Sequence, residues 1–124
     1  MKIFGHEYGF MFTVQASIDL AAICPEKKIE NLDELFAEDD AAASMVVAAE
    51  MAQILSSAHE QYKKFMDPEY EPCILTAQMA LALPHKQFAQ LQREVIESVR
   101  AGKETEVELE PSKKNNDQGA EVTE

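Results

Sequence analysis

The chain has 124 residues, of which 46% are hydrophobic and 7% aromatic, and its formal net charge at pH 7 is −12. This length fits one domain with one hydrophobic core. The acidic balance excludes the usual electrostatic route to nucleic acid, which needs clustered Lys and Arg. We therefore expect neutral or basic protein partners and no nucleic acid.

The cysteines and the apolar runs indicate a cytoplasmic chain. Cys24 and Cys73 lie far apart in the sequence, so neither belongs to a zinc or redox pair. Residues 1–7 contain no apolar signal core, and the apolar runs fall short of the roughly 20 residues that span a bilayer. We expect no membrane span and reduced thiols, although a disulfide between the two cysteines stays open.

The amino terminus predicts a β-hairpin followed by a short helix. Residues 2–4 and 8–14 read as two strands joined by 5–7, because the second segment alternates aromatic and other residues with a period of two. From residue 14 the apolar spacing becomes helical, and Pro25 ends this helix near residue 23 or 24.

An acidic stretch follows the first helix. Residues 29–36 predict another short helix with Asn31 as its cap, and residues 30–40 hold six acidic side chains. The stretch has neither the alternating ligand positions nor the glycine of a calcium loop. A solvated acidic face with helix capping is the interpretation we adopt.

A long amphipathic helix is predicted for residues 40–66, the longest helical pattern in the chain. Asp39 and Asp40 can cap its start, and Asp67-Pro68 ends it. Its polar side comprises Glu50, Gln53, Ser57, Glu60 and Lys64. Its apolar side, which we expect to face the core, comprises Val47, Met51, Ile54, Leu55, Ala58, Tyr62, Phe65 and Met66.

Residues 73–83 form an apolar segment in which the only polar side chains are Thr76 and Gln78. If this segment is a helix, it is apolar on every side, so it lies either in the core or under a partner protein. The core is the favoured interpretation. The candidate partner-binding residues, from this segment and from the side of the long helix that faces away from the core, are Met45, Val46, Ile74, Leu75, Met79 and Leu83.

The last predicted elements are a helix over 84–101 ended by Gly102, and a strand over 104–110 beside the hairpin. Residues 111–124 contain almost no bulky apolar side chain and are expected to be disordered. The predicted fold is mainly α: one globular helical domain over 1–110, with a long central helix and a minor antiparallel hairpin and edge strand.

Catalytic and metal-binding patterns are weak. His6, His59 and His85 fall in three separate elements. His59-Glu60 begins a zinc-protease motif, but Lys63 occupies the position of the second histidine. No phosphate-binding glycine loop or nucleophile elbow is present in the sequence. We therefore expect no enzyme activity, no catalytic residue, no metal and no cofactor.

The order of these parts resembles the tail assembly chaperones of long-tailed bacteriophages over about residues 2–110. The residues that carry the resemblance are a Gly-x-x-Tyr hairpin at 5–8, the run 12–16 into a short helix, the long helix, a Leu-x-x-x-x-Phe-x-x-Leu helix at 83–91 and the acidic segment before a polar tail. Lys113-Lys114-Asn115 also suits the slippery codons of the frameshift found in that family.

The resemblance implies a non-enzymatic protein that binds the tape measure protein, keeps it soluble and assists assembly of the tail tube in the bacterial cytoplasm. The implied partners are the tape measure and tail tube proteins, while homo-oligomerisation stays open. Two other interpretations remain. One is an acidic adaptor or inhibitor that covers a basic nucleic-acid-binding surface with the acids of 30–40 and 104–110. The other is a small metabolite-binding or enzymatic domain with a deep pocket at His59 or His85.

Overall fold

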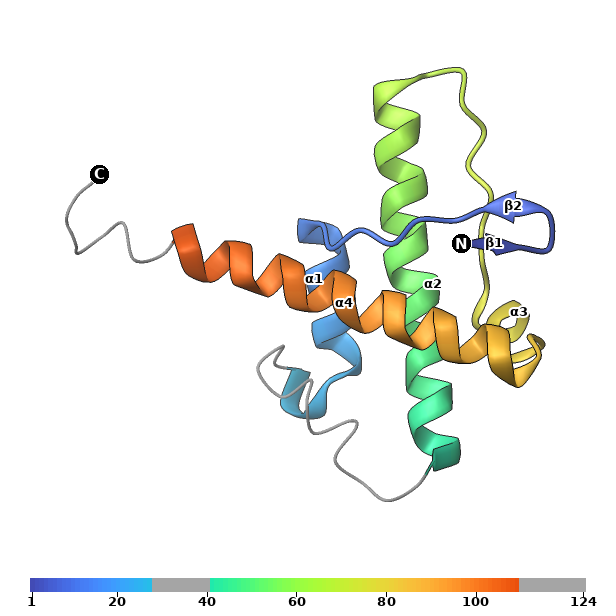
Figure 1. The fold of residues 1–124 in the computed structure, drawn as a ribbon. Helices are drawn as coiled ribbons and strands as arrows, with labels where there is room; N and C mark the ends of the chain where they lie inside the picture. The colour runs from blue at the N-terminus through green and yellow to red at the C-terminus, as the bar shows by residue number, and fades with distance from the viewer. Residues whose placement is uncertain (28–40, 110–124) are drawn as a thin grey trace.

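The computed structural model describes residues 1–27 and 41–109, and this part is mainly helical with one small antiparallel sheet, which confirms the predicted fold class (Figure 1). The side chains of residue 25 and of residues 103–109 lie outside the description. In chain order the elements are β1 (Lys2–Ile3), β2 (His6–Glu7), α1 (Val14–Ile23), the 3-10 helix η1 (Pro25–Lys27), α2 (Ala41–Met66), α3 (Ala77–Leu81) and α4 (His85–Leu109).

Helix α2 is the centre of the fold and confirms the predicted long helix. The helices α1, α3 and α4 all contact it, and α4 crosses it at a steep angle (Figure 1). The helix ends at Met66, directly before Asp67-Pro68, because a proline disfavours the helical conformation of the residue that precedes it. The Nζ atom of Lys64 donates a hydrogen bond to the Pro68 carbonyl and closes this end.

The buried face of α2 differs from the predicted one. It is rotated by roughly 100°, about one residue position, and it is rich in small residues that let neighbouring segments approach closely. The predicted core residues Tyr62, Phe65 and Met66 are instead 48%, 82% and 70% exposed. Glu60, which we predicted on the polar side, is buried. The residues that α2 buries are Ala48, Ala49, Met51, Ala52, Leu55, Ser56 and Glu60.

An amino-terminal hairpin is present as predicted, but its second strand is His6–Glu7, which lies inside the predicted turn over 5–7. Lys2 pairs with Glu7 and Ile3 with His6, so the turn is Phe4-Gly5, both at positive φ. The predicted strand over 8–14 is wrong: this segment crosses α2 in an extended form and leads into α1 (Figure 1). Of the described residues 8–14, only Tyr8 extends the hairpin pairing, since its amide donates to the Met1 carbonyl at 2.9 Å and its carbonyl accepts from the Met1 amino group at 2.7 Å. Further along, the Met11 amide donates to the Leu55 carbonyl of α2 at 3.2 Å.

Helix α1 has the predicted position. Thr13 caps it, because its Oγ1 accepts a hydrogen bond from the Ala16 amide at 3.1 Å. Ala16 and Leu20 face the core. The short helix expected over 29–36 and the acids of 30–40 lie outside the described residues.

The apolar segment 73–83 is only partly helical. Residues 71–76 are extended, Thr76 caps α3 by accepting from the Met79 amide, and α3 is a single short helix. The core interpretation holds for Leu75 and Ala80, which are fully buried, but not for Ile74 and Leu81, which are 48% and 46% exposed.

Helix α4 is longer than predicted, and the strand expected over 104–110 is wrong because the helix continues to Leu109. The alternating pattern there is built largely from Glu, a good helix former, so the segment can continue the helix that precedes it. Gly102 is not a helix cap. A Cβ atom built on it would lie 2.1 Å from Cδ2 of Phe12, so the glycine makes room for that ring. Residues 111–124 lie outside the described part.

One described helix, α2, is long and apolar enough to cross a membrane by length and composition alone, with a mean hydropathy of 1.3. This differs from the expectation that no apolar run is long enough. The support for a membrane span is weak, because the central helix of a folded core passes the same test, and α2 carries most contacts of this fold.

Candidate functional site

An apolar groove lies between the start of α1 and the second half of α2. It has a volume of about 590 Å³. Thr13 and the first two turns of α1 form one wall, and three turns of α2 form the other. We call it the α1–α2 groove; its lining residues are Thr13, Val14, Gln15, Ala16, Asp19, Ile54, Ser57, Ala58, Gln61, Tyr62 and Phe65.

The groove presents large apolar side chains to solvent. Val14 is 80% exposed, Tyr62 48% and Phe65 82%, while Ile54 and Ala58 are half-buried beneath them. Four of these residues, all except Val14, belong to the apolar stripe that the sequence assigned to the core. In the described part of the chain, the second half of that stripe is therefore left without cover.

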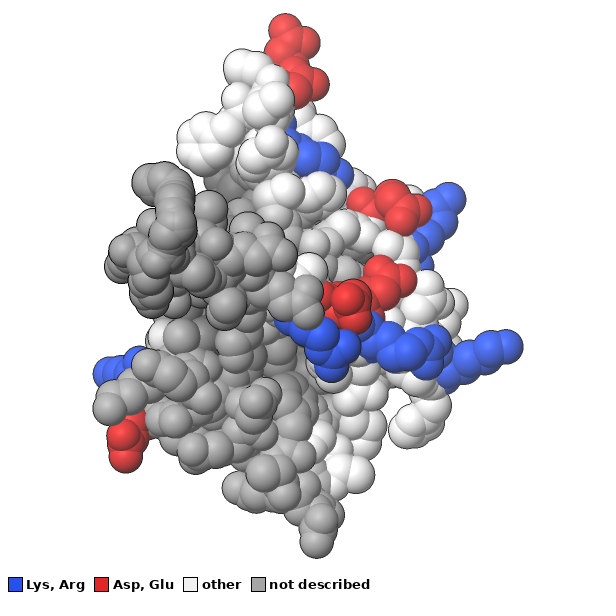
Figure 2. Space-filling view, turned by 60° about the vertical axis from the view of Figure 1, so that its left-hand side comes forward, with Lys and Arg blue, Asp and Glu red and all other residues white. Residues whose placement is uncertain are grey.

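The charge around the groove is acidic and sparse. Among the described residues, Asp19 is the only charged one in the lining, and Gln15 donates a hydrogen bond to one Asp19 carboxylate oxygen at 3.0 Å. The two lysines in the last turn of α2 turn toward residues 68–73: Lys63 lies over the Tyr70 ring, and Lys64 binds the Pro68 carbonyl. In Figure 2 the upper part of the face shown is mainly uncharged, whereas Lys, Arg, Asp and Glu gather on its right-hand side.

A buried carboxylate ties the hairpin and the 67–76 segment to α2. Glu60 is 1% exposed and accepts hydrogen bonds from the Tyr70 hydroxyl at 2.6 Å and from the Cys73 amide at 2.9 Å. His6 Nε2 lies 3.1 Å, and Lys63 Nζ 3.3 Å, from its second oxygen. Both carboxylate oxygens are thus fully used. We call these residues the Glu60 cluster.

These contacts shift the pKa values of the cluster. Burial by itself raises the pKa of Glu60, but the hydrogen bonds from Tyr70, Cys73, His6 and Lys63 outweigh it and lower the pKa to about 2. The bond to Glu60 raises the pKa of the Tyr70 hydroxyl, and the contact with Tyr70 raises the pKa of Lys63. Glu60 is therefore a permanent anion at neutral pH, which suits a structural carboxylate better than a proton-transfer group.

His59 faces away from this cluster and lies against the hairpin exit. A Cβ atom on Gly9 would lie 2.5 Å from His59 Cε1 and Nδ1, so the glycine allows the ring to pack there. Nδ1 is buried and has no hydrogen-bond partner among the described residues. Burial lowers the pKa of His59 below its ordinary value.

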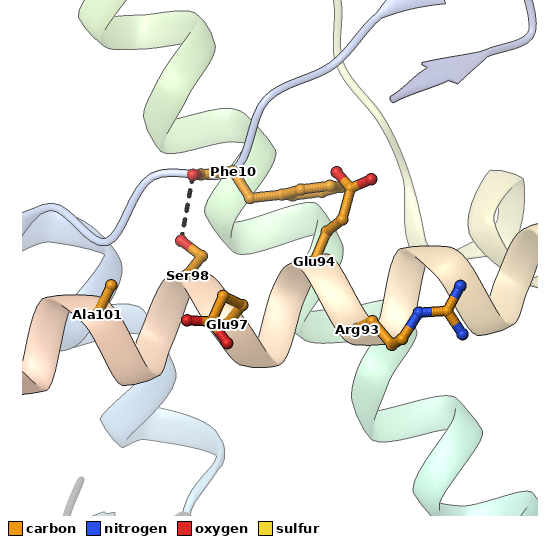
Figure 3. Close-up of a pocket in the computed structure, with 6 residues that line it drawn as sticks. All are labelled: Phe10, Arg93, Glu94, Glu97, Ser98 and Ala101. Atoms are coloured by element: carbon orange, nitrogen blue, oxygen red, sulfur yellow. Dashed lines mark hydrogen bonds between the residues drawn. The ribbon is translucent and has the colours of Figure 1, made fainter.

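A second, shallower cavity of about 560 Å³ lies between α4 and residues 8–13, which we call the crossing segment (Figure 3). Ser98 Oγ donates to the Phe10 carbonyl across it at 3.1 Å, which fixes the crossing segment on α4. The other lining residues are Ala101 and three charged residues of both signs, Arg93, Glu94 and Glu97, whose side chains point in different directions (Figure 3). This arrangement gathers no catalytic group.

The sequence-predicted partner-binding residues lie outside the α1–α2 groove. Leu75 is fully buried, and Met45, Met79 and Leu83 pack against the core. Val46 and Ile74 are 46% and 48% exposed. The groove residues were missed because their apolar stripe was assigned to the core. The signal that was available is that Tyr62 and Phe65 lie near the end of α2, where fewer elements can cover them.

Within residues 1–27 and 41–109, no group of three His, Cys, Asp or Glu side chains is placed to hold a metal ion, and no disulfide joins Cys24 to Cys73. The chain matches no family model, no curated protein and no solved structure.

Proposed function

We propose that this protein is a non-enzymatic tail assembly chaperone of a long-tailed bacteriophage, which binds the tape measure protein, keeps it soluble and assists assembly of the tail tube. The observation that carries the proposal is the α1–α2 groove, where Val14, Tyr62 and Phe65 remain exposed on a small acidic domain. Contiguous exposed apolar side chains on a small domain mark a protein-binding surface.

The physical task fits such a groove. A tape measure protein is long, helical and partly apolar, so it needs partners that cover its apolar stripes reversibly. An amphipathic helix that lays its apolar face into a hydrophobic groove is a recurring mode of this kind. We choose the tape measure protein over other helical proteins because the order of the sequence elements resembles that of the tail assembly chaperones.

Co-expression tests the proposal. The chain is produced together with an affinity-tagged tape measure protein taken from the same genome. We expect the soluble fraction of the tape measure protein to rise several-fold and the two proteins to co-purify. An unrelated acidic helical protein of similar size is the control. A tape measure protein that stays equally insoluble in both cases contradicts the proposal.

The acidic adaptor is the alternative. Its proposed contacts are the acids of 30–40 and 104–110, whose side chains lie outside the described part of the chain. The observation that supports the chaperone instead is the apolar lining of the α1–α2 groove, which an adaptor acting through carboxylates does not need. The metabolite-binding alternative requires a pocket with His59 or His85 facing a carboxylate, and neither histidine lines the two cavities described above.

A further inference from the structure

We infer that the α1–α2 groove binds one amphipathic α-helix of about three turns whose apolar stripe is flanked by Lys or Arg, with a basic side chain placed against Asp19. This inference deepens the proposed function and rests on it for taking a protein segment as the ligand. It adds the docking surface, the length of the bound segment and its charge.

The length follows from the α2 wall. Groove residues recur from Ile54 to Phe65 along one face of α2. At 1.5 Å per residue this wall is roughly 16 Å long, which matches about 11 residues of a bound helix. A helix lying along it has apolar partners at spacings of three and four, because Ile54, Ala58, Tyr62 and Phe65 follow the same spacing.

The openness of the groove favours a helix over a small molecule. Small-molecule sites enclose most of their ligand's surface. Here the two largest rim residues, Tyr62 and Phe65, are 48% and 82% exposed, and Val14 opposite them is 80% exposed. Such rims leave one side of a ligand in solvent, which suits a helix with a polar outer face.

Charge complementarity sets the sign of the partner. In the part of the chain that the structure describes, Asp19 is the only charged lining residue, and the lysines nearest in sequence to Phe65 bind residues 68–70 and Glu60 instead. The chain as a whole carries a formal net charge of −12. A basic helix is attracted and an acidic one repelled, while the apolar contacts supply most of the affinity.

The test uses two synthetic peptides of 18 residues made of Leu and Ala, one with Lys and one with Glu at the polar positions. Binding to the full chain is measured by fluorescence anisotropy. Phe65→Ser removes a rim aromatic, and Phe4→Ser, at a 64% exposed residue on the hairpin turn, is its matched control. Asp19→Lys reverses the groove charge, and Glu71→Lys makes the same change at an exposed residue outside the groove lining.

We expect both peptides to bind through their apolar stripe, with the Glu peptide several-fold weaker than the Lys peptide. Phe65→Ser should lower the affinity for the Lys peptide by about tenfold or more, while Phe4→Ser should change that affinity by less than about twofold. Asp19→Lys should weaken binding of the Lys peptide by roughly two- to fivefold more than Glu71→Lys does. The inference is overturned if neither peptide binds at millimolar concentration, if the Glu peptide binds as well as the Lys peptide, or if either variant behaves as its control.

The co-expression assay separates this inference from the proposed function. If the Phe65→Ser chain solubilises the tape measure protein as well as the original chain does, the chaperone proposal stands and the groove assignment falls. If the peptide results hold but the tape measure protein stays insoluble, the groove binds basic helices and the chaperone proposal falls.

Discussion

At the scale of single residues, Glu60 accepts hydrogen bonds from three separate segments: the hairpin, α2 itself and the 67–76 segment. A carboxylate as buried as this one is stable only where donors replace the water that it has lost. Here the Tyr70 hydroxyl and the Cys73 amide donate hydrogen bonds to one carboxylate oxygen, while His6 and Lys63 contact the other. The cluster therefore positions the hairpin and this segment relative to α2.

Replacing Glu60 with Gln tests this role. The amide keeps the size of the side chain but loses the charge and presents an N–H group to the donors. We expect the free energy of unfolding at pH 7 to fall by about 2 to 4 kcal/mol. Chemical denaturation measures it. Glu50→Gln, at an exposed position on the same helix, is the control and should change the free energy by less than about 0.5 kcal/mol. Equal effects of the two substitutions would rule out a stabilising role for the cluster.

The same carboxylate predicts an acid limb in stability. Glu60 has a pKa of about 2 in the folded protein against 4.5 for an ordinary glutamate, so the unfolded state binds more protons between these values. Its contribution is fully present above about pH 4.5 and is lost as the pH falls toward 2. At 1.36 kcal/mol per pKa unit the loss is roughly 3 kcal/mol. Thermal unfolding of the original chain and of Glu60→Gln from pH 2 to 7 should show a smaller acid limb in the variant; parallel curves would contradict the assignment.

At the scale of elements, the junction of α4 with the crossing segment depends on Gly102. In an exposed helix, Gly→Ala is stabilising by roughly 1 kcal/mol. Here the added Cβ would lie 2.1 Å from Cδ2 of the Phe12 ring and 2.8 Å from its Cγ, so we expect Gly102→Ala to destabilise the protein by about 1 to 3 kcal/mol.

The Phe12→Ala background provides the control for Gly102→Ala. With the ring removed, the same substitution should become neutral or stabilising, because only the helix propensity of alanine remains. Denaturation of the two single variants and the double variant gives the coupling between the two positions. If Gly102→Ala stabilises the protein with Phe12 in place, the contact does not determine the choice of glycine there.

Local signals predicted the helices well and the strands poorly. The start of α1 after Thr13 and the end of α2 at Asp67-Pro68 depend on capping and on proline sterics, which act within a few residues. The alternation over 104–110 predicted a strand, but a strand needs a partner, and β1 and β2 pair only with each other. Without one, the helix formers there continue α4.

The candidate sites depend on contacts that are distant in sequence, and for this reason the sequence did not predict them. From the sequence alone, Glu60 has the pattern of a solvent-exposed helix residue. Its burial depends on His6, 54 positions away, and on the Cys73 amide, which the fold places beside it. The buried face of α2 carries Ala48, Ala52 and Ser56, whose small side chains weigh little in an apolar pattern although they permit close packing. The larger Tyr62 and Phe65 dominated that pattern and were assigned to the core.

At the scale of the whole molecule, α2 has more apolar surface than the described elements cover. The alanine-rich face of α2 packs against α3 and α4. The first half of its apolar stripe packs against the core, but the α1–α2 groove remains open. A domain of this size has few elements with which to cover two faces of a 26-residue helix. This exposed part of the stripe is the surface to which we assign the proposed partner helix.

Salt dependence distinguishes groove binding from an acidic adaptor. Binding through the apolar groove with one contact at Asp19 should weaken by less than about tenfold between 0.05 and 0.5 M NaCl, since an exposed ion pair contributes roughly 0.2 to 1 kcal/mol. An adaptor that covers a basic surface with many carboxylates depends on charges screened over about 8 Å at physiological salt, so its affinity should fall by orders of magnitude. Titration calorimetry of the purified complex at several salt concentrations measures the slope. A steep slope that persists in Phe65→Ser would identify the acids, and not the groove, as the binding surface.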